Sequence, residues 1–595
     1  MCGIAGVMMR SGASPDQAAL AALTKALAHR GPDGEGQYID GAVGLVHTRL
    51  AIIDLETGDQ PLFEKPDAQT SGATVITNGE IYNYRELQKE FPAETFHTAS
   101  DCEQSLHLYR RDGTTFARNL RGMYAIALYD ADIKQLLLCR DPFGIKPLYY
   151  CEMPDGLAFA SEASALVAAG YASPAIDERV SAELLQLQFT TGTTTPFKGI
   201  QRVAPGETLV IRDGQIVERQ QIKTLPEDGP ERISEADALA RLDDALMNSV
   251  EFHQRSDVPY GMFLSGGIDS SALLTLMARL NDQPVRTYTA GFPGTGAHDE
   301  RDHARLVAQS LKADVVDVPV TEQDFWAHLP EIAAAMDDPV ADYAIVPTWL
   351  LGRAAARDIK VVLTGEGGDE LFGGYGRYRS AQRPGWLGGR AMRRKGIFDG
   401  LDVLRDNSLD WRDGFARSEQ AAANASRSKL QSAQATDCAD WLPNDLLIKA
   451  DRCLMAHGVE GRVPFLDPVI TQAAFLLPDN LKIRHKRGKY LLRKWLDNAL
   501  PVADAFAKKR GFTVPVGEWI ACQGKRLGPL VAAQPGIAEV ARPDQVVRLF
   551  ENTSEKRHAF AAWSLLFYAL WHNRHILNAD IDGDVFHALH TNQSN

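Results

Sequence analysis

The spacing of apolar residues changes near residue 234, and this change divides the chain into two parts of different fold class. In the first part, turn-forming residues separate short apolar runs at 44–47, 73–77, 124–129, 135–139 and 207–211. Such runs are typical of strands in antiparallel sheets. In the second part, apolar strands alternate with helical segments, which indicates a doubly wound parallel sheet with flanking helices.

The first part also contains two segments with helical spacing, at 15–28 and 102–111. The apolar pattern fades between 213 and 234, in a stretch that includes Pro226 and Gly229. Composition of this kind predicts a linker. We therefore expect a first domain over residues 2–212, a linker over 213–234 and a second domain over 235–595.

A helix should open the second domain, because Ser234 and Asp237 resemble a capping box ahead of a run of leucines at helical spacing. The expected strands are 262–264, 286–292, 313–320 and 360–364, and the expected helices between them are 272–280, 301–311 and 347–357. The last 200 or so residues are expected to be mostly helical. The polar stretch 408–440 is predicted to be an irregular or helical surface segment.

The composition is that of an ordinary globular protein, with 45% apolar and 24% charged residues among 595. The net charge of −14 excludes a broad nucleic-acid surface. No uncharged apolar run is long enough to span a membrane, and no basic leader precedes the first strand, so we expect a cytoplasmic protein. A basic stretch is expected to be a solvated or ion-paired surface, or to steer a polyanion such as ATP; it comprises Arg377, Arg379, Arg383, Arg390, Arg393, Arg394 and Lys395.

Seven cysteines are scattered without a CxxC pair, which argues against a zinc ribbon or a disulfide framework. Six of them are expected to be small buried hydrophobic residues: Cys102, Cys139, Cys151, Cys438, Cys453 and Cys522. Cys2 differs, because removal of Met1 would give it a free α-amine beside its thiol. The reference pKa of such an amine is about 7.7–8.0, so the amine can serve as the local base for the thiol.

Five polar motifs follow Cys2, at 29–34, 47–54, 78–83, 100–103 and 140–144. Arg49 could bind the α-carboxylate of an amino-acid amide, and Asp101 its α-ammonium group. An asparagine amide and a glycine N–H could stabilise the oxyanion of a tetrahedral intermediate. Taken singly, each motif also has an interpretation as a turn, because Asn-Gly and Arg-Gly-Pro-Asp-Gly are good turn formers.

Together with Cys2, these motifs resemble the class II glutamine amidotransferase domain, an N-terminal-nucleophile fold of stacked antiparallel sheets between helices. The resemblance covers nearly all of residues 2–211. It implies that Cys2 attacks the glutamine amide, with Asn78 and Gly79 as oxyanion donors. It further implies that the glutamine pocket is lined by Arg49, Leu50, Ala51, Ile52, Ile53, Asn78, Gly79, Glu80 and Asp101.

A second chemical motif joins a predicted strand to a predicted helix, and it runs Leu264-Ser265-Gly266-Gly267-Ile268-Asp269-Ser270-Ser271. The glycines let the backbone approach a phosphate, the serines add donors, and the helix N-terminus favours an anion. Asp269 would repel a bare phosphate, so its expected task is Mg²⁺ coordination. The motif is neither a Walker loop nor a dinucleotide fingerprint. An N-cap turn without function is the alternative.

A further glycine-rich loop, residues 364–375, places the carboxylates Glu366, Asp369 and Glu370 close together. Three acidic side chains at this spacing would repel one another unless a cation or an ammonium group lies between them. This loop also follows an apolar strand, at the edge where parallel sheets bind their ligands.

With both loops, the whole chain resembles the glutamine-hydrolysing asparagine synthetase family, an amidotransferase domain joined to an ATP-pyrophosphatase domain. Further matches are 339–342, 451–455, 460–467 and 508–512, whereas residues 386–437 and those after Thr553 match poorly. The resemblance implies that Asp269 and Asp369 hold Mg²⁺ and that Glu366 takes part in forming an acyl-adenylate. It implies ATP contacts from Leu264, Ser265, Gly266, Gly267, Asp269, Ser270, Ser271, Ala290, Thr364, Gly365 and Lys509.

The implied substrates are glutamine, aspartate and ATP, with a shielded path that carries neutral ammonia between the centres and a homodimer as the common assembly. Three alternatives stay open: an amidotransferase for another carboxylate (a sugar acid, a peptide or a natural-product precursor), a β-lactam-forming cyclase, and a non-enzymatic sensor. Glu366 favours aspartate, because relatives with other acceptors often carry aspartate there. Cys2 argues against the cyclase, and the intact set of Cys2, Asp269, Glu366 and Asp369 argues against the sensor.

Overall fold

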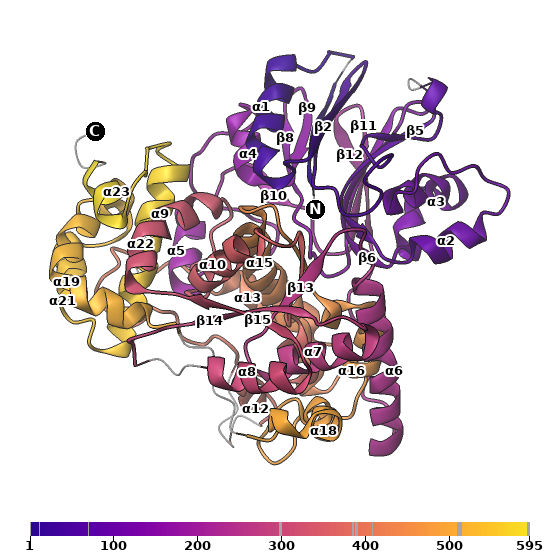
Figure 1. Cartoon of the computed structure of the whole chain (residues 1–595). Helices are drawn as coiled ribbons and strands as arrows, with labels where there is room; N and C mark the ends of the chain where they lie inside the picture. Colours follow the sequence, from indigo (N-terminus) through magenta and orange to yellow (C-terminus); the bar gives the residue numbers. More distant parts are fainter. Residues whose placement is uncertain are drawn as a thin grey trace.

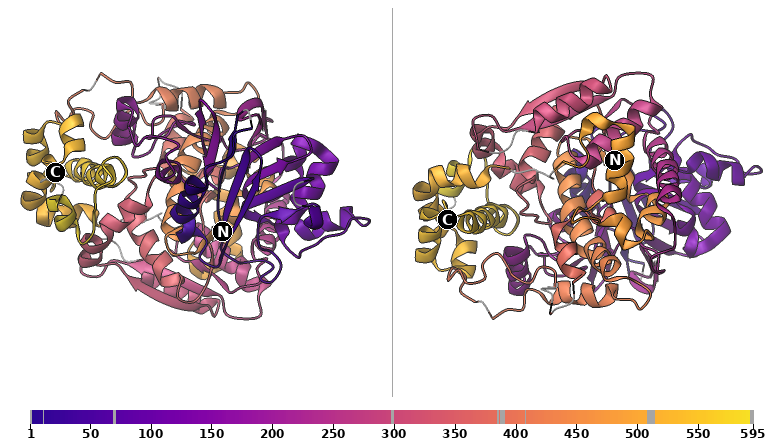
Figure 2. Two further views of the ribbon diagram at one scale, coloured as in Figure 1. Left: turned by 90° about the horizontal axis from the view of Figure 1, so that it is seen from above. Right: turned by 90° about the horizontal axis from the view of Figure 1, so that it is seen from below.

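The computed structural model describes residues 2–10, 12–68, 71–296, 300–383, 386, 391–406, 408–507 and 514–591. An antiparallel N-terminal domain lies on a larger domain that contains a parallel sheet (Figure 1). Both views in Figure 2 place the C-terminal helices at the opposite end of the molecule from the purple N-terminal helices α2 and α3. The predicted fold class of both domains is therefore confirmed.

The N-terminal domain contains two antiparallel six-stranded sheets within the described residues. The first has the order β10-β8-β9-β1-β3-β2, and its strands are β1 (Gly3–Met9), β2 (Gly34–Asp40), β3 (Val43–Arg49), β8 (Tyr149–Met153), β9 (Gly156–Ala160) and β10 (Ile200–Arg202). The second has the order β12-β11-β7-β6-β5-β4, and its strands are β4 (Leu62–Phe63), β5 (Ala73–Ile81), β6 (Gly122–Asp130), β7 (Gln135–Arg140), β11 (Glu207–Arg212) and β12 (Gln215–Gln221).

Alternation along β1 shows how the two sheets stack. Ile4 and Met8 pack into the core between the sheets, whereas Ala5 and Val7 face the helical layer on the other side. Successive side chains of a strand point to opposite faces, so a strand buried on both faces must be apolar throughout. The helices of this domain are α1 (Gln17–Leu27), α2 (Tyr84–Glu90), α3 (Gln104–Asp112), α4 (Ala163–Ala168) and α5 (Glu178–Leu187).

The N-terminal domain extends beyond the predicted boundary at 212. Strand β12 lies in the stretch 213–234 that was expected to be a linker, and it pairs antiparallel with β11. Its residues are mostly exposed, because it forms the edge of the sheet, so no apolar run marked it in the sequence. The chain leaves the sheet after Gln221 and enters α6 (Glu235–His253). Ser234 caps this helix by accepting the N–H of Asp237, but the Asp237 carboxylate accepts from the Ser234 hydroxyl instead of completing a capping box.

The second domain is built on a parallel sheet of order β15-β14-β13-β16-β17. Its strands are β13 (Tyr260–Phe263), β14 (Arg286–Gly291), β15 (Asp314–Pro319), β16 (Val361–Leu363) and β17 (Glu460–Arg462). The chain moves outward from β13 on one side to β14 and β15, and on the other side to β16 and β17. Parallel sheets bind ligands at such a switch point, outside the carboxyl ends of the strands. The loops at 264–267 and 364–367 both lie there.

Helices cover this sheet and extend it. Those near the sheet are α7 (Ile268–Leu280), α8 (Arg301–Ser310), α9 (Glu322–Ala335), α10 (Ile345–Ala355), α11 (Gly368–Phe372), α12 (Gly376–Ala381), α15 (Leu447–Met455), α16 (Pro468–Phe475), α17 (Asp479–Lys482) and α18 (Tyr490–Ala499). The C-terminal ones are α19 (Val516–Ala532), α20 (Pro535–Val540), α21 (Pro543–Glu551), α22 (Lys556–His575) and α23 (Val585–Thr591). The expected helical C-terminal part is confirmed apart from β17, which is too short to be recognised from its residues.

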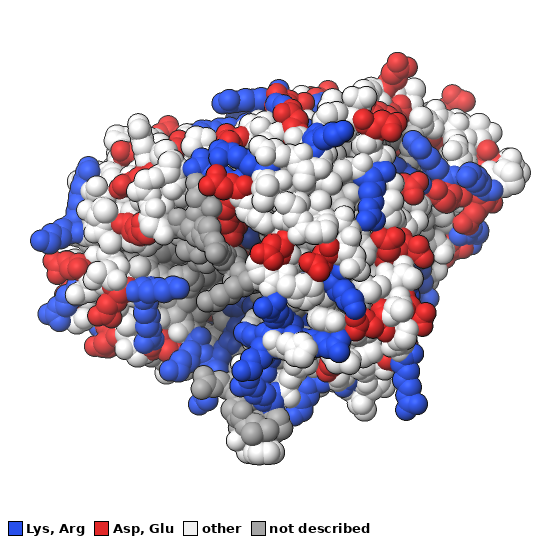
Figure 3. Space-filling view, turned by 60° about the horizontal axis from the view of Figure 1, so that its bottom comes forward, with Lys and Arg blue, Asp and Glu red and all other residues white. Residues whose placement is uncertain are grey.

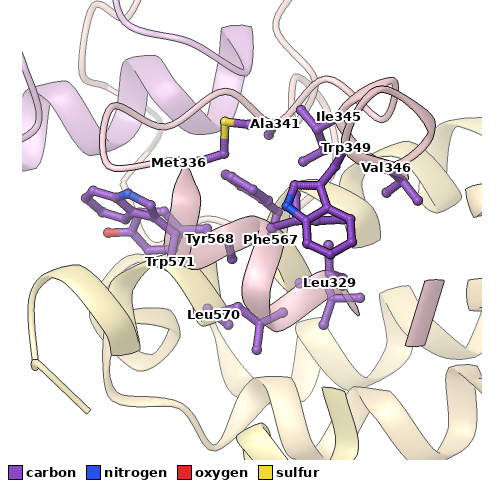
Figure 4. Packing of buried hydrophobic residues seen from close by; sticks show 14 of the residues in the cluster. Leu329, Met336, Ala341, Ile345, Val346, Trp349, Phe567, Tyr568, Leu570 and Trp571 are labelled. Carbon is purple, nitrogen blue, oxygen red and sulfur yellow. The ribbon is translucent and has the colours of Figure 1, made fainter. Parts of the chain in front are cut away.

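Helix α22 is the centre of the C-terminal core. Its aromatic side chains pack against Leu329 of α9 and Trp349 of α10 in one cluster (Figure 4). The indole N–H of Trp563 donates to the carbonyl of Ala341 at 2.6 Å, and that of Trp571 to the carbonyl of Asp337 at 3.2 Å. These bonds fix the segment 337–341, which leads to Asp342 in the wall of a cavity at the end of the parallel sheet.

Two further expectations are corrected. The stretch 408–440 contains α13 (Asp413–Ala422) and α14 (Lys429–Thr436), and α14 is buried instead of lying on the surface. The reason is that the amides of Gln431 and Gln434 bind backbone carbonyls of neighbouring helices, at 2.6–2.9 Å, so polar residues fill the core here. Helix α14 continues into a π-helical segment, Asp437–Leu446, and then α15. Cys522 is exposed, whereas the other cysteines are buried as predicted.

Only part of the basic stretch 377–395 lies on the surface. Arg379, Arg383, Arg394 and Lys395 are exposed, as predicted. Arg377 instead reaches inward to an ion pair with Asp437 at 2.7 Å, and Arg390 lies outside the described residues. Lys and Arg side chains gather in the lower half of the face in Figure 3. Among the described residues, none of the helices is long and apolar enough to cross a membrane.

Candidate active sites

Cys2 lies directly before β1, where the first sheet meets β5 of the second. It is 7% exposed. Its backbone N–H donates to Oδ1 of Asn78 at 3.2 Å, and its carbonyl accepts from Nε of Arg30 at 3.2 Å. Burial raises the pKa of its thiol, although a hydrogen bond from the backbone of Leu50 opposes this change. A base close to the sulfur is therefore needed to form the thiolate.

Asn78 and Gly79 stand beside Cys2 in the middle of β5. While Oδ1 of Asn78 accepts from Cys2, its Nδ2 is buried and has no hydrogen-bond partner among the described residues. A buried donor without a partner is costly, so such groups often serve a ligand. Gly79 has a φ of +154°, and a Cβ there would lie 2.1 Å from the carbonyl oxygen of Met123. Only glycine fits at this position.

The other residues of the expected glutamine pocket come from two loops. Arg49 ends β3, and its guanidinium binds Asp59 at 2.6 Å and the carbonyls of Ile53 and Asp54. Asp101 accepts the N–H of Ile81 at 2.7 Å, and burial raises its pKa to about 6. The loop between them contributes Leu50, Ala51, Ile52 and Ile53, of which only Ala51 is not buried.

A buried charge cluster from the second domain reaches this pocket, and the sequence did not predict it. Arg462 of β17 lies 3.4 Å from the carboxylate of Glu80 and 2.5 Å from that of Glu460. Burial raises the pKa of Glu460, but Arg462 outweighs it and brings the pKa to about 2. Burial and the charge of Glu460 together raise the pKa of Glu80. One guanidinium therefore lies between two carboxyls, and it lowers the pKa of Glu460 while the pKa of Glu80 stays raised.

A cavity of about 420 Å³, called here the sheet-end cavity, opens at the carboxyl ends of β13, β14 and β16 in the second domain. Most of the residues predicted to bind the nucleotide or the metal line this cavity, together with Glu366: Leu264, Ser265, Asp269, Ser270, Ala290, Thr364, Gly365 and Asp369. Gly266 and Gly267 belong to the same loop, and Ser271 follows in α7 with a buried hydroxyl that has no partner among the described residues. Lys509 lies outside the described residues.

Glycines bring the two loops of this cavity into contact. Gly266 and Gly367 have left-handed φ angles of +71° and +91°. A Cβ on Gly368 would lie 2.5 Å from Oδ1 of Asp269, so only glycine lets the second loop come this close. The hydroxyls of Ser265 and Ser270 are 3.1 Å apart and hold the first loop in shape.

An ammonium group lies between the two predicted metal ligands. Nζ of Lys489 pairs with the carboxylate of Asp269 and, at 2.8 Å, with that of Asp369. Of the three loop carboxylates expected to surround a cation or an ammonium group, Lys489 pairs with Asp369 only, and its other partner, Asp269, comes from the first loop. The paired carboxylates offer the hard oxygen ligands that Mg²⁺ prefers. Among the described residues no three acidic, His or Cys side chains form a complete metal site, so Mg²⁺ there would need phosphate or water oxygens as well.

The cavity also carries Lys449 and Asp342, to which the sequence analysis gave no role, beside Glu366 and Glu370 of the predicted acidic loop. Lys449 of α15 pairs with Asp342 at 3.0 Å, and both line the cavity. Glu370 accepts from the hydroxyl of Tyr375 at 2.7 Å, and burial raises the pKa of Glu370 to about 7. Oε2 of Glu366 is buried without a hydrogen-bond partner in the described part of the chain. Of the two residues without an assigned role, Asp342 lies in the matching segment 339–342, whereas nothing in the sequence marked Lys449.

The two sites meet at β17. The N–H of Thr364, which lines the sheet-end cavity, donates to the carbonyl of Arg462 at 2.8 Å. The guanidinium of the same Arg462 reaches Glu80 on the side of Cys2. A small void of about 10 Å³ lies beside this contact and is lined by residues of both domains, among them Lys146, Thr364 and Asp451.

Comparison with known proteins gives two family matches. Residues 1–222 match the glutamine amidotransferase domain, and residues 241–573 match asparagine synthase. The chain is 32% identical to asparagine synthetase [glutamine-hydrolyzing] 1 of Bacillus subtilis, over 97% of each chain. It is 34% identical to a putative asparagine synthetase [glutamine-hydrolyzing] of Mycobacterium tuberculosis, over 96% of this chain and 97% of that one. It is 29% identical to asparagine synthetase B [glutamine-hydrolyzing] of Escherichia coli, over 87% of this chain and 83% of that one.

Proposed function

This chain belongs to the asparagine synthase family, and we propose that it makes asparagine from aspartate, ATP and glutamine, releasing AMP, pyrophosphate and glutamate. The observation that carries this function is the position of Arg462. Its carbonyl accepts a hydrogen bond from Thr364 in the loop of the sheet-end cavity. Its guanidinium lies beside the carboxyl of Glu80 in the Cys2 pocket. A site that frees ammonia and a site that activates a carboxylate thus share one residue.

In the N-terminal domain we assign Cys2 as the nucleophile. Removal of Met1 frees the α-amine of Cys2, which takes the thiol proton while the sulfur attacks the amide carbon of glutamine. Nδ2 of Asn78 and the N–H of Gly79 donate to the oxyanion. The C–N bond then breaks, ammonia leaves with the proton from the amine, and water hydrolyses the thioester to glutamate. Arg49 and Asp101 would hold the two charged ends of glutamine.

In the second domain the loop 264–271 would bind the phosphates of ATP. Asp269 and Asp369 would hold Mg²⁺, which supplies charge neutralisation on the phosphates, and Lys489 and Lys509 would add positive charge nearby. A β-carboxylate oxygen of aspartate attacks the α-phosphorus, and pyrophosphate leaves. Ammonia then attacks the carbonyl of the adenylate, and AMP leaves. Glu366, which has a buried oxygen without a partner, would act beside this carbonyl.

The reaction suits the cytoplasm, where ATP is abundant and thiols stay reduced, and we propose that location. The homodimer that the family resemblance implies stays a prediction.

Pyrophosphate release from the purified protein tests the function, with ATP, Mg²⁺ and glutamine and with or without aspartate. We expect pyrophosphate to depend on aspartate and to match the asparagine found by mass spectrometry. Glutamine hydrolysis without aspartate-stimulated pyrophosphate would reject aspartate as the acceptor and leave the amidotransferase half intact.

A further inference from the structure

Lys482, the last residue of α17, is a fully buried lysine that the proposed reaction does not use. Its Nζ pairs with no carboxylate among the described residues. It donates instead to Oε1 of Gln434 at 3.0 Å and to the carbonyl of Phe475 at 2.6 Å. Burial lowers the pKa of Lys482 to about 7, although the charge of Asp479 opposes this change. Burying an amine away from any carboxylate is costly, so its two hydrogen bonds need an explanation.

Gln434 links Lys482 to the acidic loop of the sheet-end cavity. It lies in α14 and is also fully buried. Its Nε2 donates to the carbonyl of Glu370 at 2.6 Å and to that of Leu371 at 2.7 Å. Both carbonyls belong to α11, the helix that carries Asp369 and Glu370 to the cavity wall. Lys482 is therefore two hydrogen bonds away from the backbone of this helix.

Lys482 fixes the direction in which the Gln434 amide points. A glutamine amide has two N–H donors on one side and a carbonyl oxygen on the other. The two carbonyls of α11 can only accept, and Nζ of Lys482 donates whether or not it carries a charge, so a single orientation satisfies both ends. Without Lys482, Oε1 of Gln434 would be a buried acceptor without a partner, and the observed orientation would lose its advantage.

Helix α11 depends on bonds from outside, because it has only five residues. A helix leaves its last four carbonyls without partners of its own. Backbone N–H groups of Gly374 and Lys489 bind the first and the last of these four, at 2.8 and 3.0 Å. Gln434 binds the two in between. Its amide thus satisfies half of this helix end.

We propose that Lys482 is a positioning residue of the second domain: acting through Gln434, it holds α11 so that the carboxylates of Asp369 and Glu370 face the cavity. The inference rests on the proposed function and adds to it a residue that lies outside the cavity wall. A misplacement of about 1 Å can slow a reaction by ~100-fold, so bonds that fix the backbone of this helix affect the rate without touching a substrate.

Amide hydrogen exchange, followed by mass spectrometry on peptides that cover 365–375, measures how firmly α11 is held and requires no substrate. The variants are Lys482→Met, Gln434→Met and the double variant. Gln431→Met is the matched control, because Gln431 is equally buried in α14 and donates to the carbonyl of Phe475, which Lys482 also binds. The rates of pyrophosphate release with ammonium and of glutamine hydrolysis are measured on the same proteins.

Lys482→Met should speed exchange in α11 by roughly tenfold, the effect of one lost buried hydrogen bond, and should lower the kcat of pyrophosphate release by roughly tenfold to a hundredfold. Glutamine hydrolysis in the other domain should keep its kcat and KM, which distinguishes a displaced helix from a smaller folded fraction. Gln434→Met should change exchange in α11 at least as much. Adding Lys482→Met to it should have no further effect, because Lys482 acts through Gln434.

Three results would overturn the inference. The first is exchange in α11 that stays within about twofold of wild type in Lys482→Met, well below the effect of a lost hydrogen bond. The second is an equal change in Gln431→Met, which a merely structural role would produce. The third is an additive effect in the double variant.

If Lys482→Met did not fold, the comparison of Gln434→Met with Gln431→Met would decide, and equal exchange in α11 of those two variants would overturn the inference. Absence of aspartate-dependent pyrophosphate in the wild-type protein would instead reject the proposed function. The two failures are distinguishable, because hydrogen exchange is measured without substrates.

Discussion

Arg30 and Asp451, 421 residues apart in the chain, form a bidentate ion pair with distances of 2.8 and 3.0 Å. Both side chains are buried, and Nε of the same guanidinium holds the carbonyl of Cys2. Asp451 belongs to α15, which also carries Lys449 at the sheet-end cavity. The backbone of Cys2, the proposed nucleophile, is thus tied to a helix that lines the cavity of the second domain.

Loss of this ion pair should destabilise the whole protein. Arg30→Ala leaves Asp451 and Glu162 buried with fewer positive charges, and breaking a buried pair costs about 3–5 kcal/mol. Denaturant titration of the wild type and the variant gives the difference in their free energies of unfolding. Arg179→Ala is the control, because Arg179 makes a surface pair with Asp413 and should cost less than about 1 kcal/mol. Equal losses for the two variants would contradict the importance of the buried pair.

Cys2→Ala should abolish glutaminase activity and glutamine-dependent synthesis while ammonium-dependent synthesis continues. The reason is that the adenylate forms in the second domain without help from the thiol. Asparagine production with each nitrogen source measures the split, and Cys522→Ala, at an exposed cysteine, should retain both activities. Loss of both activities in Cys2→Ala would refute the division of labour between the domains.

The titration of Asp101 should appear in the pH profile of the glutaminase reaction. Its carboxyl must be ionised to bind the α-ammonium of glutamine, and burial raises its pKa to about 6. The kcat/KM for glutamine should therefore be full above this pH and fall as the pH drops through about 6. In Asp101→Asn the value should be low and should lose this inflection. An unchanged profile in that variant would remove Asp101 from glutamine binding.

Lys489 should stabilise the folded protein when Mg²⁺ is absent, because it neutralises the carboxylates of Asp269 and Asp369. Lys489→Met leaves Asp269 and Asp369 facing each other, which should cost about 2 kcal/mol, less than a fully buried pair because both carboxylates are partly exposed. Added Mg²⁺ should then raise the melting temperature of the variant more than that of the wild type. Lys494→Met, at a surface lysine of the same helix, is the control. Equal Mg²⁺ shifts in all three proteins would contradict the prediction.

Local pattern was enough to predict most of the fold. Strands β6 and β7 are largely apolar on both faces, and β13 and β16 end in glycine-rich loops, so their type and their positions along the chain follow from the residues alone. Strand β17 has three residues, two of them charged, and only its pairing with β16 defines it. Strand β12 is likewise defined by its partner, because an exposed edge strand needs no apolar run.

The candidate sites likewise contain contacts that the sequence predicts and contacts that it does not predict. Residues within one motif, such as Ser265 and Asp269, were predicted together and lie together. Contacts between distant segments were not predicted: Arg462 with Glu80, and Lys489 with Asp269. Each joins a predicted site residue, Glu80 or Asp269, to a basic side chain that the sequence analysis did not assign, and only tertiary packing brings the two together.

The most direct test of the connected sites is the source of the nitrogen in asparagine. The enzyme would be given glutamine labelled with ¹⁵N at the amide, together with unlabelled ammonium at a concentration too low to support synthesis in Cys2→Ala, and the asparagine would be examined by mass spectrometry. The account predicts asparagine that is almost fully labelled, because ammonia passes from Cys2 to the adenylate past Arg462 without mixing with solvent. Label diluted to the proportion of the bulk ammonium would contradict it.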